Sequence, residues 1–216
     1  MMAPLYLGID TALGGLSLCL WQDSREIQGI QQPQLNDQAA QLVPAIEALL
    51  NAARVPYSEL SGIIVTVGPG GFTGVRIGLA TARALGFAAG VPVMGVSTLQ
   101  VMARTAPSDS ATILCVLPAG RDQLYVQSFG EHALYGEPTM VSVDTVRALA
   151  LNGMHLVITD QPWRAALPAN TSFTMHDPTH NARLACQLAN DGAAEMPEAL
   201  PLYIRPPDAK PQTPLF

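Results

Sequence analysis

The sequence predicts an α/β protein built from two similarly organised lobes with a cleft between them. An apolar run at residues 62–65 leads into a glycine-rich segment and then an apolar helix, the order of a buried strand, a turn and a covering helix. The order three strands, helix, strand, helix is indicated twice, on either side of a polar, helix-breaking segment at 107–110. We therefore expect lobes at 1–106 and 111–205, followed by a proline-rich tail at 206–216.

The first lobe begins with three expected strands, after which the hydrophobic period becomes helical. Residues 5–10 form an apolar run that ends on a carboxylate, and residues 16–21 follow the period of two that is typical of a paired strand. A third strand is expected at 26–32, and Asn36 or Asp37 is suited to cap the helix that follows. The helix is indicated by apolar residues at helical spacing: Ala39, Leu42, Val43, Ile46, Leu49, Leu50 and Ala53.

The glycine-rich segment opens a second helix, which we expect to begin near Thr73 and to stop at Gly90, with a short strand at 93–96 beyond it. Its polar residues between Gly74 and Ala89 are Arg76, Thr81 and Arg83. A helix that is apolar nearly all round must be covered on more than one side. One side can lie on the sheet, and the other favours a protein partner.

Small residues on this helix predict a groove that another helix can enter. Glycine costs roughly 1 kcal/mol against alanine inside a helix, so close approach must favour it here. The preceding amphipathic helix can add three larger side chains beside the groove. The predicted partner interface consists of Leu42, Ile46, Leu49, Gly74, Arg76, Gly78 and Ala82. Arg76 forms either a salt bridge at the helix start or a fork that reaches a carboxylate on the partner.

Two other interpretations of the segment are less favoured. A glycine turn that opens a helix can hold a phosphate group, but residues 68–73 carry no lysine and match no nucleotide-binding fingerprint. A membrane span is disfavoured by Arg76 and Arg83, which cost about 2.5–3.5 kcal/mol each on insertion scales.

The second half repeats the order of elements with less clear periodicity. Strands are expected at 112–117, 124–129, 139–143 and 155–159, and helices at 144–151 and 179–189.

Composition limits the possible functions. With a net charge of -6 and no basic run, the chain is not expected to hold nucleic acid on its own. Only 13% of the residues are charged, which predicts that another protein covers part of the surface. Cys19, Cys115 and Cys186 fit no zinc spacing and suit a reducing cytoplasm, where we expect them to be buried. The N-terminus shows no signal-peptide pattern.

Four sequence blocks resemble the TsaB family of non-catalytic dimerisation subunits in bacterial tRNA threonylcarbamoyladenosine biosynthesis. They lie at 8–12, 68–78, 95–99 and 201–205, and the signature loop comprises Gly68, Pro69, Gly70, Phe72 and Thr73. The resemblance implies the duplicated fold of actin, sugar kinases and heat-shock ATPases. It also implies a catalytic paralogue, TsaD, an ATPase subunit, TsaE, and contact with tRNA only through the complex. The family pairs through a four-helix interface, and a homodimer is expected when the partner is absent.

The chain departs from the catalytic paralogue where that protein carries two histidines four residues apart. Thr98 and Met102 stand there, and neither supplies a nitrogen donor, so no metal site is expected. Asp10 and Thr11 match the first phosphate loop of the superfamily, which we interpret as vestigial. The turn of the second lobe has Pro118-Ala119-Gly120 in place of polar residues found in many relatives.

His176 and His180 are also four apart, but Asp177 and Pro178 start a helix between them, which places His176 outside that helix. We therefore expect no metal, no cofactor and no chemistry in this chain. The alternatives are an enzyme of the same superfamily, nucleotide-binding or metallopeptidase-like, that acts in the interlobe cleft, and a nucleotide sensor without hydrolysis.

Overall fold

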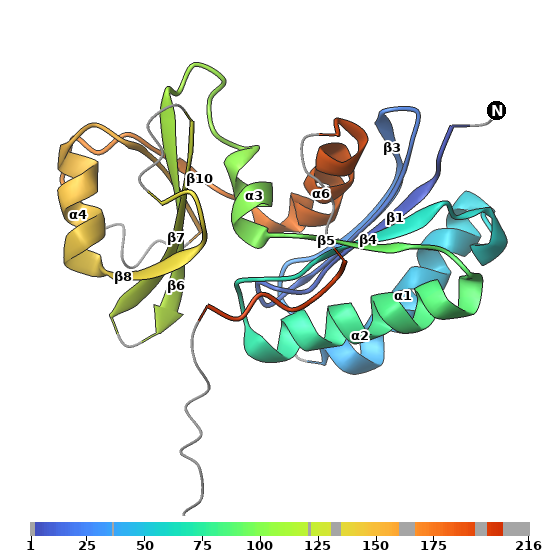
Figure 1. The fold of residues 1–216 in the computed structure, drawn as a ribbon. Coiled ribbons are helices and arrows are strands. Elements are labelled where there is room, and N and C mark those ends of the chain that lie inside the picture. Colours follow the sequence, from blue (N-terminus) through green and yellow to red (C-terminus); the bar gives the residue numbers. More distant parts are fainter. Residues whose placement is uncertain are drawn as a thin grey trace, which may run out of the picture.

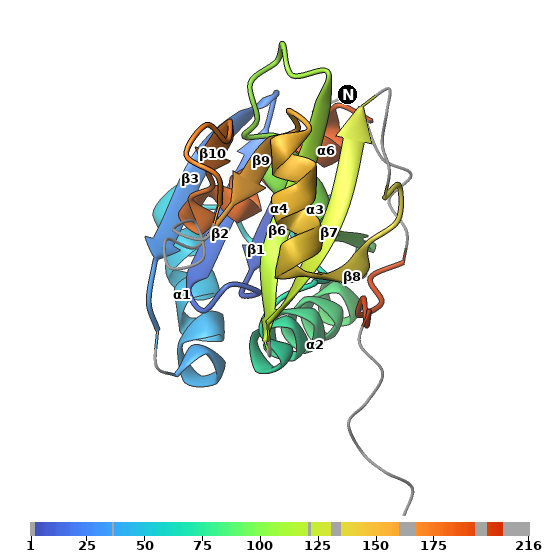
Figure 2. The same cartoon turned by 90° about the vertical axis from the view of Figure 1, so that its left-hand side faces the viewer.

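The computed structural model describes residues 3–35, 37–120, 122–130, 135–159, 167–192 and 198–204. Within them the chain forms two five-stranded sheets, which are separated by two helices and covered by others on their outer faces (Figures 1 and 2). The expected tail at 206–216 lies outside the described residues.

The first sheet has the strand order β3-β2-β1-β4-β5. Strand β1 is antiparallel to β2 and parallel to β4, so it lies at the centre of the sheet, and its neighbours bury it on both sides. The strands are β1 (Tyr6–Asp10), β2 (Leu16–Gln22), β3 (Arg25–Gln32), β4 (Gly62–Thr66) and β5 (Val93–Val96).

The second sheet repeats this topology in the order β10-β9-β6-β7-β8. Its first strand, β6, is again antiparallel to the next strand and parallel to the fourth, which confirms the predicted duplication. The strands are β6 (Thr112–Gly120), β7 (Gln123–Gly130), β8 (Thr139–Ser142), β9 (His155–Ile158) and β10 (Phe173–Met175). Strand β10 was not predicted, because three residues are too few to show a period.

The helices form three layers around the two sheets (Figure 1). Helices α1 (Gln38–Ala53) and α2 (Phe72–Ala89) cover one face of the first sheet, and α4 (Val143–Leu151) covers the outer face of the second. Between the sheets lie α3 (Thr98–Ala103) and α6 (Asn181–Asn190), with short 3-10 helices η1 (Tyr57–Glu59) and η2 (Pro178–His180) in the connections.

The two inner helices are exchanged between the lobes. Helix α3 belongs to the first half of the sequence, but its Leu99 and Met102 pack with Cys115 and Leu117 of the second sheet. Helix α6 belongs to the second half and packs against β1, β2 and β4 of the first sheet. The strands of the first sheet all lie within residues 6–96 and those of the second within 112–175, whereas α6 from the end of the chain covers the first sheet. Helix α3 also places Val101 in the cluster formed by α6 and the first sheet, so the two inner helices tie the lobes together.

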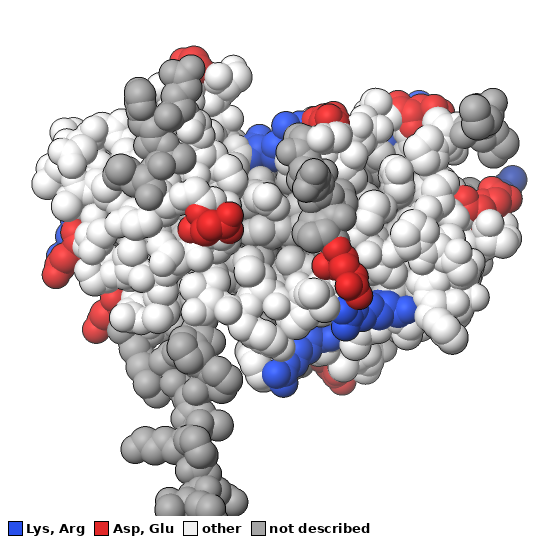
Figure 3. Space-filling view, viewed as in Figure 1, with Lys and Arg blue, Asp and Glu red and all other residues white. Residues whose placement is uncertain are grey.

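The structure agrees with the expectations from composition. Cys19, Cys115 and Cys186 are all buried free thiols, and burial raises the pKa of Cys115 far above its usual value. Charged side chains are sparse on the face drawn in Figure 3. No helix in the described ranges is long and apolar enough to cross a membrane.

Candidate functional site

A buried polar network lies between the lobes, centred on Asp10 at the end of β1. Strands β1 and β4 run in parallel register, so Thr66 at the end of β4 lies beside Asp10 and donates its hydroxyl proton to Oδ1. The Ala12 N–H approaches the same oxygen at 3.4 Å. The other oxygen, Oδ2, accepts from the side-chain amide of Asn181 at 3.1 Å. Both carboxylate oxygens of Asp10 therefore have partners within the chain.

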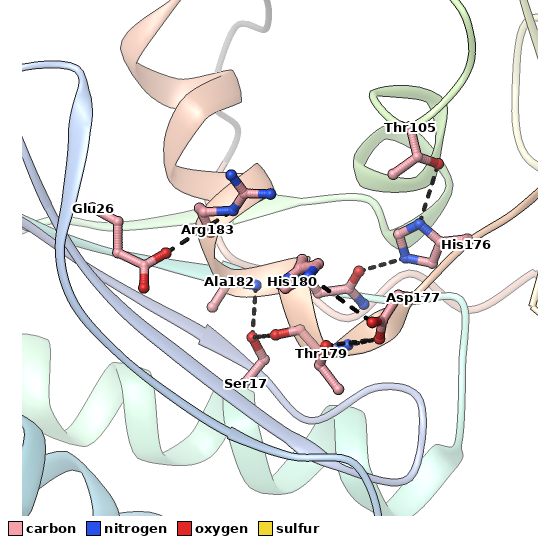
Figure 4. A network of polar contacts seen from close by, with 10 residues as sticks. Ser17, Glu26, Thr105, His176, Asp177, Thr179, His180, Ala182 and Arg183 are labelled. Carbon is pink, nitrogen blue, oxygen red and sulfur yellow. Dashed lines mark hydrogen bonds and ion pairs between the residues drawn. The ribbon is translucent and has the colours of Figure 1, made fainter.

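The network continues from Asn181 through His176 to Thr105, at the end of α3. Because the Asn181 amide nitrogen donates to Asp10, its oxygen accepts from His176 Nε2, 2.7 Å away. The second ring nitrogen of His176 lies 3.3 Å from the Thr105 hydroxyl (Figure 4). That hydroxyl also lies 2.7 Å from the carbonyl oxygen of Met102, so its single proton serves two acceptors. The network links the inner helices α3 and α6 to the first sheet.

Burial shifts the titration of both ionisable groups in the network. Desolvation raises the pKa of Asp10, although the hydrogen bonds from Thr66, Asn181 and Ala12 partly oppose this. Desolvation lowers the pKa of His176, and the hydrogen bond to Asn181 and the nearby Asp177 partly oppose the decrease. At neutral pH the structure therefore favours a neutral imidazole that donates from Nε2.

The start of α6 is fixed by a side chain from another element. His180 at its N-cap makes no capping hydrogen bond, but Ser17 of β2 accepts from the Ala182 N–H at 3.2 Å. Ser17 also donates to the carbonyl of Thr179 at 2.8 Å (Figure 4). A free N–H at the helix start is thus satisfied from the first sheet, which positions Asn181 against Asp10.

A cavity of about 370 Å³ opens beside this network, at the place of the interlobe cleft. It is lined by Ala12, Leu13, Gly14, Gly70, Gly71, Leu117, Pro118, Thr159 and Pro178. None of these lining residues, all from the described part of the chain, is charged, so they offer no side chain to pair with a nucleotide phosphate or to hold its magnesium ion.

The residues of the vestigial phosphate loop are engaged inside the chain. Asp10 is saturated as described, and the buried Thr11 donates its hydroxyl proton to the carbonyl of Gly74 at 2.7 Å. Thr11 therefore docks the start of α2 onto the end of β1. The prediction that these two residues bind a cofactor remains untested, but neither side chain is free in this structure.

The metal positions of the catalytic paralogue correspond to buried side chains here. Thr98 and Met102 are both fully buried beneath the second sheet. Asp177 caps η2 with Pro178 at its start, as predicted, so His176 points into the network while His180 lies 3.9 Å from Asp177. Among the described residues, no three histidine, cysteine, aspartate or glutamate side chains are grouped as metal ligands would be.

The signature loop joins three elements by backbone contacts. The Gly71 N–H donates to Ala12 at 2.7 Å, and the Gly68 carbonyl accepts from Thr98 at 2.8 Å. A β-carbon at Gly70 would lie 2.5 Å from the carbonyl oxygen of Ala12, which only glycine avoids. Gly68, Gly70 and Gly71 thus connect the end of β1 and the start of α3 at the beginning of α2, whereas Phe72 and Thr73 are exposed.

The rotation predicted for α1 and α2 is wrong. Leu42, Ile46 and Leu49 are fully buried in the core of the first lobe, and Ala82 lies in the same core. A β-carbon at Gly74 would lie 2.1 Å from the carbonyl oxygen of Thr11, and one at Gly78 would lie 2.4 Å from the Thr11 hydroxyl. The small residues therefore let α2 approach the chain's own first sheet. Of the seven predicted interface residues, Arg76 alone is exposed.

The opposite faces of these helices form what we call the outer helical surface. Its exposed residues on α2 are two phenylalanines, two arginines, three alanines and one threonine: Phe72, Thr73, Arg76, Ala80, Arg83, Ala84, Phe87 and Ala88. Phe87 is 93% exposed and Phe72 is 58% exposed. On α1 the exposed residues are mainly small and apolar, with three polar ones among them: Ala39, Ala40, Gln41, Val43, Pro44, Glu47, Ala48, Asn51 and Ala52. Basic side chains are visible along the position of α2 in Figure 3, with acidic side chains beside them.

Sequence reasoning missed three residues of the network. Thr66, Thr105 and Asn181 lie far apart in the sequence, and only the fold brings them to Asp10 and His176. A polar residue at the end of a buried strand was the one available signal, and it applies to Thr66.

Comparison with known proteins agrees with the fold and the motifs. The family model of TsaD, tRNA N6-adenosine threonylcarbamoyltransferase, matches residues 31–197. An uncharacterised protein of Mycobacterium bovis is 32% identical over 80% of this chain and 77% of its own length. The tRNA threonylcarbamoyladenosine biosynthesis protein TsaB of Bacillus subtilis is 31% identical, over 55% of this chain and 52% of that protein.

Solved structures show the same architecture. YeaZ from Pseudomonas aeruginosa superposes with a TM-score of 0.74 at 25% identity, covering 93% of this chain and 99% of that one. The ethanolamine utilization protein EutJ of Carboxydothermus hydrogenoformans shares the fold, with a TM-score of 0.51 at 10% identity over 87% of this chain and 91% of that one. The match to the family model covers well over half of the sequence. The chain therefore belongs to the TsaD family, and its relatives include proteins named TsaB.

Proposed function

We propose that this chain is a non-catalytic partner subunit for tRNA threonylcarbamoyladenosine formation. In this role it holds a TsaD-type catalytic paralogue in an active arrangement, together with a TsaE-type ATPase, in the cytoplasm. The modified nucleoside is the adenosine beside the anticodon, and tRNA is contacted only through the complex.

One observation carries the non-catalytic part of this proposal. The carboxylate of Asp10, which stands where the superfamily orients magnesium or water, is saturated by Thr66, Ala12 and Asn181. Among the residues that the structure describes, those lining the cavity beside it include no second carboxylate and no basic group. An acid, base or metal site in the cleft would need at least one further group of this kind.

The outer helical surface supports the partner role. Two exposed phenylalanines and a series of alanines form an apolar area on the two outer helices, which is typical of a surface that another protein covers. Two such helices from each of two related subunits can form a four-helix contact. The same surface would support a homodimer of the isolated chain.

Reconstitution tests the function. The purified chain, the catalytic paralogue and the ATPase subunit are mixed with unmodified tRNA, ATP and an activated threonylcarbamoyl donor, and the nucleosides are measured by mass spectrometry. We expect modification by the complete mixture and none when this chain is omitted. Full modification without it would contradict the proposal.

A second measurement separates this proposal from an enzyme or a nucleotide sensor. The melting temperature of the isolated chain is recorded with and without ATP and magnesium, because a ligand that binds the folded state raises it. We expect no shift, and no ATP hydrolysis by the chain alone. A saturable increase in melting temperature would show that the cleft binds nucleotide.

A further inference from the structure

The chain returns to the first lobe after α6 as an extended segment, residues 198–204, which we call the strap. Glu198 pairs with Met94 at the edge of the first sheet, and the Leu202 N–H donates to the carbonyl of Val67 at 2.8 Å. Ala199 between these anchors is buried, and its α-carbon would lie 3.1 Å from a β-carbon at Gly95. The strap is therefore fixed along β5 and the signature loop.

The strap places Tyr203 against the first turns of α2. The Nε of Arg76 donates to the Tyr203 hydroxyl at 3.0 Å. The Arg76 guanidinium carbon lies 3.6 Å from the centre of the Phe72 ring and 5.8 Å from that of Tyr203. Phe72 and Tyr203 are 58% and 54% exposed, so this arginine lies over the Phe72 ring and beside the Tyr203 ring at the surface.

This arrangement orients the guanidinium without using its terminal nitrogens. Arginine has five N–H donors, and the bond to Tyr203 uses the one on Nε. No acidic residue in the described ranges forms an ion pair with Arg76. The two terminal amino groups are therefore available as a fork that matches the two oxygens of a carboxylate.

We propose that Arg76, Phe72 and Tyr203 form one docking surface for an acidic side chain of the partner subunit. The carboxylate accepts from the terminal N–H groups of Arg76, and the two rings pack around the stem of the partner's side chain. The strap is thereby a part of the partner interface and positions its arginine. This inference rests on the proposed function, since it requires that a protein partner binds the outer helical surface.

Charge favours a carboxylate over an RNA phosphate as the occupant. The chain carries a net charge of -6, and the exposed charges of α2 are the two arginines, Arg76 and Arg83. Two separate arginines do not form the basic stripe that nucleic acid requires, whereas a single stacked arginine at an apolar surface is typical of protein interfaces.

The test is the affinity for the purified TsaD-type paralogue, measured by titration calorimetry at low and high salt. Four variants are compared with wild type: Arg76→Gln, Arg76→Lys, Tyr203→Leu and, as a charge-matched control on the opposite side of the molecule, Arg147→Gln. We expect Arg76→Gln to weaken binding at least about tenfold, and Arg76→Lys nearly as much because lysine has no fork. Tyr203→Leu should weaken it about three- to tenfold, and Arg147→Gln less than about twofold.

Salt dependence distinguishes a direct ion pair from a structural role of the strap. Wild-type affinity should fall with salt, and the dependence should be smaller in Arg76→Gln but retained in Arg147→Gln. If Arg76→Gln binds the paralogue as tightly as wild type, the docking surface is wrong but the proposed function stands. If the Arg76 variants lose affinity and Tyr203→Leu does not, the strap has no role in the interface. Absence of wild-type association overturns the proposed function as well. If the isolated chain binds tRNA and Arg76→Gln abolishes that binding, the occupant is a phosphate and the proposal is wrong.

Discussion

The interlobe network and the docking surface around Arg76 each join side chains from distant parts of the chain, but they differ in what remains unsatisfied. In the network, both oxygens of Asp10 and both ring nitrogens of His176 have partners, and the group is buried. At the surface, Arg76 is exposed and is oriented by Tyr203 and Phe72, and no described residue forms a hydrogen bond or ion pair with its terminal nitrogens.

This difference indicates two different roles. A buried polar group costs free energy unless it is paired, so the fully paired network fixes how the inner helices pack. It leaves no unpaired donor or acceptor that could bind a ligand. An exposed arginine that the chain orients but does not pair can gain two charge-assisted hydrogen bonds on association. The first region therefore stabilises the chain, and the second is suited to recognition.

The largest effect is expected at the inner face of α2, where Gly78→Arg should unfold the chain. A β-carbon there meets the Thr11 hydroxyl at 2.4 Å, and the charged side chain would be forced toward the first sheet. An unpaired buried charge costs about 3–5 kcal/mol, a large share of a typical stability. Circular dichroism and urea unfolding measure the loss.

Ala80→Arg is the matched control for this substitution. Ala80 lies on the outer helical surface of the same helix, so the chain should fold normally with an arginine there. A native Gly78→Arg variant that only fails to bind its partner would restore the originally predicted rotation of α2.

The next largest effect is expected from Asn181→Ala in the interlobe network. This change leaves Oδ2 of Asp10 and Nε2 of His176 without their buried partners, at about 1–3 kcal/mol for each group. We expect a total loss of about 2–6 kcal/mol in the free energy of unfolding. Asn190→Ala, at the exposed end of the same helix, should cost less than about 0.5 kcal/mol. Equal effects of the two changes would show that the network contributes nothing to stability.

A smaller effect is expected on the outer helical surface, from Phe87→Ser. Phe87 is 93% exposed in the isolated chain, so its loss should not change the unfolding transition. It should weaken association with the paralogue, and any homodimer, by about 1–2 kcal/mol, or roughly five- to thirtyfold. Analytical ultracentrifugation measures both equilibria. Unchanged association would place the partner on another face.

The smallest effect is expected on the pH dependence of stability, to which the buried His176 contributes. Burial lowers the pKa of His176 in the folded state below its ordinary value of 6.5, so the unfolded chain binds the proton more readily. The stability associated with the neutral imidazole is fully present above pH 6.5 and is lost as pH falls toward the folded pKa. His176→Gln should therefore reduce the loss of stability on acidification below pH 6.5.

Two other groups set the controls for this titration. His155 also has a lowered pKa, mainly through burial, so His155→Gln reports how much of the same pH window comes from the second lobe. The raised pKa of Asp10 acts in the opposite direction, because its burial cost appears only as pH rises above 3.8 through the folded pKa. An unchanged pH profile in His176→Gln would contradict the prediction.

Local patterns in the sequence determined most of the elements and their order. The apolar run before the glycine loop, the period-two residues of β2 and the helical spacing of α1 depend on neighbours in the chain, and each element lies where it was predicted. Asp37 caps α1 through the Ala40 N–H, as a residue of that type before an apolar helix indicates. The signature loop likewise indicated the family before any contact was known.

The tertiary structure alone decided which faces of these elements meet. An apolar helix with small residues can approach either its own sheet or another subunit, and periodicity does not distinguish these neighbours. Thr11 and the first sheet occupy the inner side of α2, which leaves Phe72, Arg76 and Phe87 outward. The structure also decided how α3 and α6 pack between the sheets. Asp10 pairs with Asn181, 171 positions away, and Arg76 with Tyr203, 127 positions away. Such contacts depend on the packing of whole elements, and no local pattern encodes them.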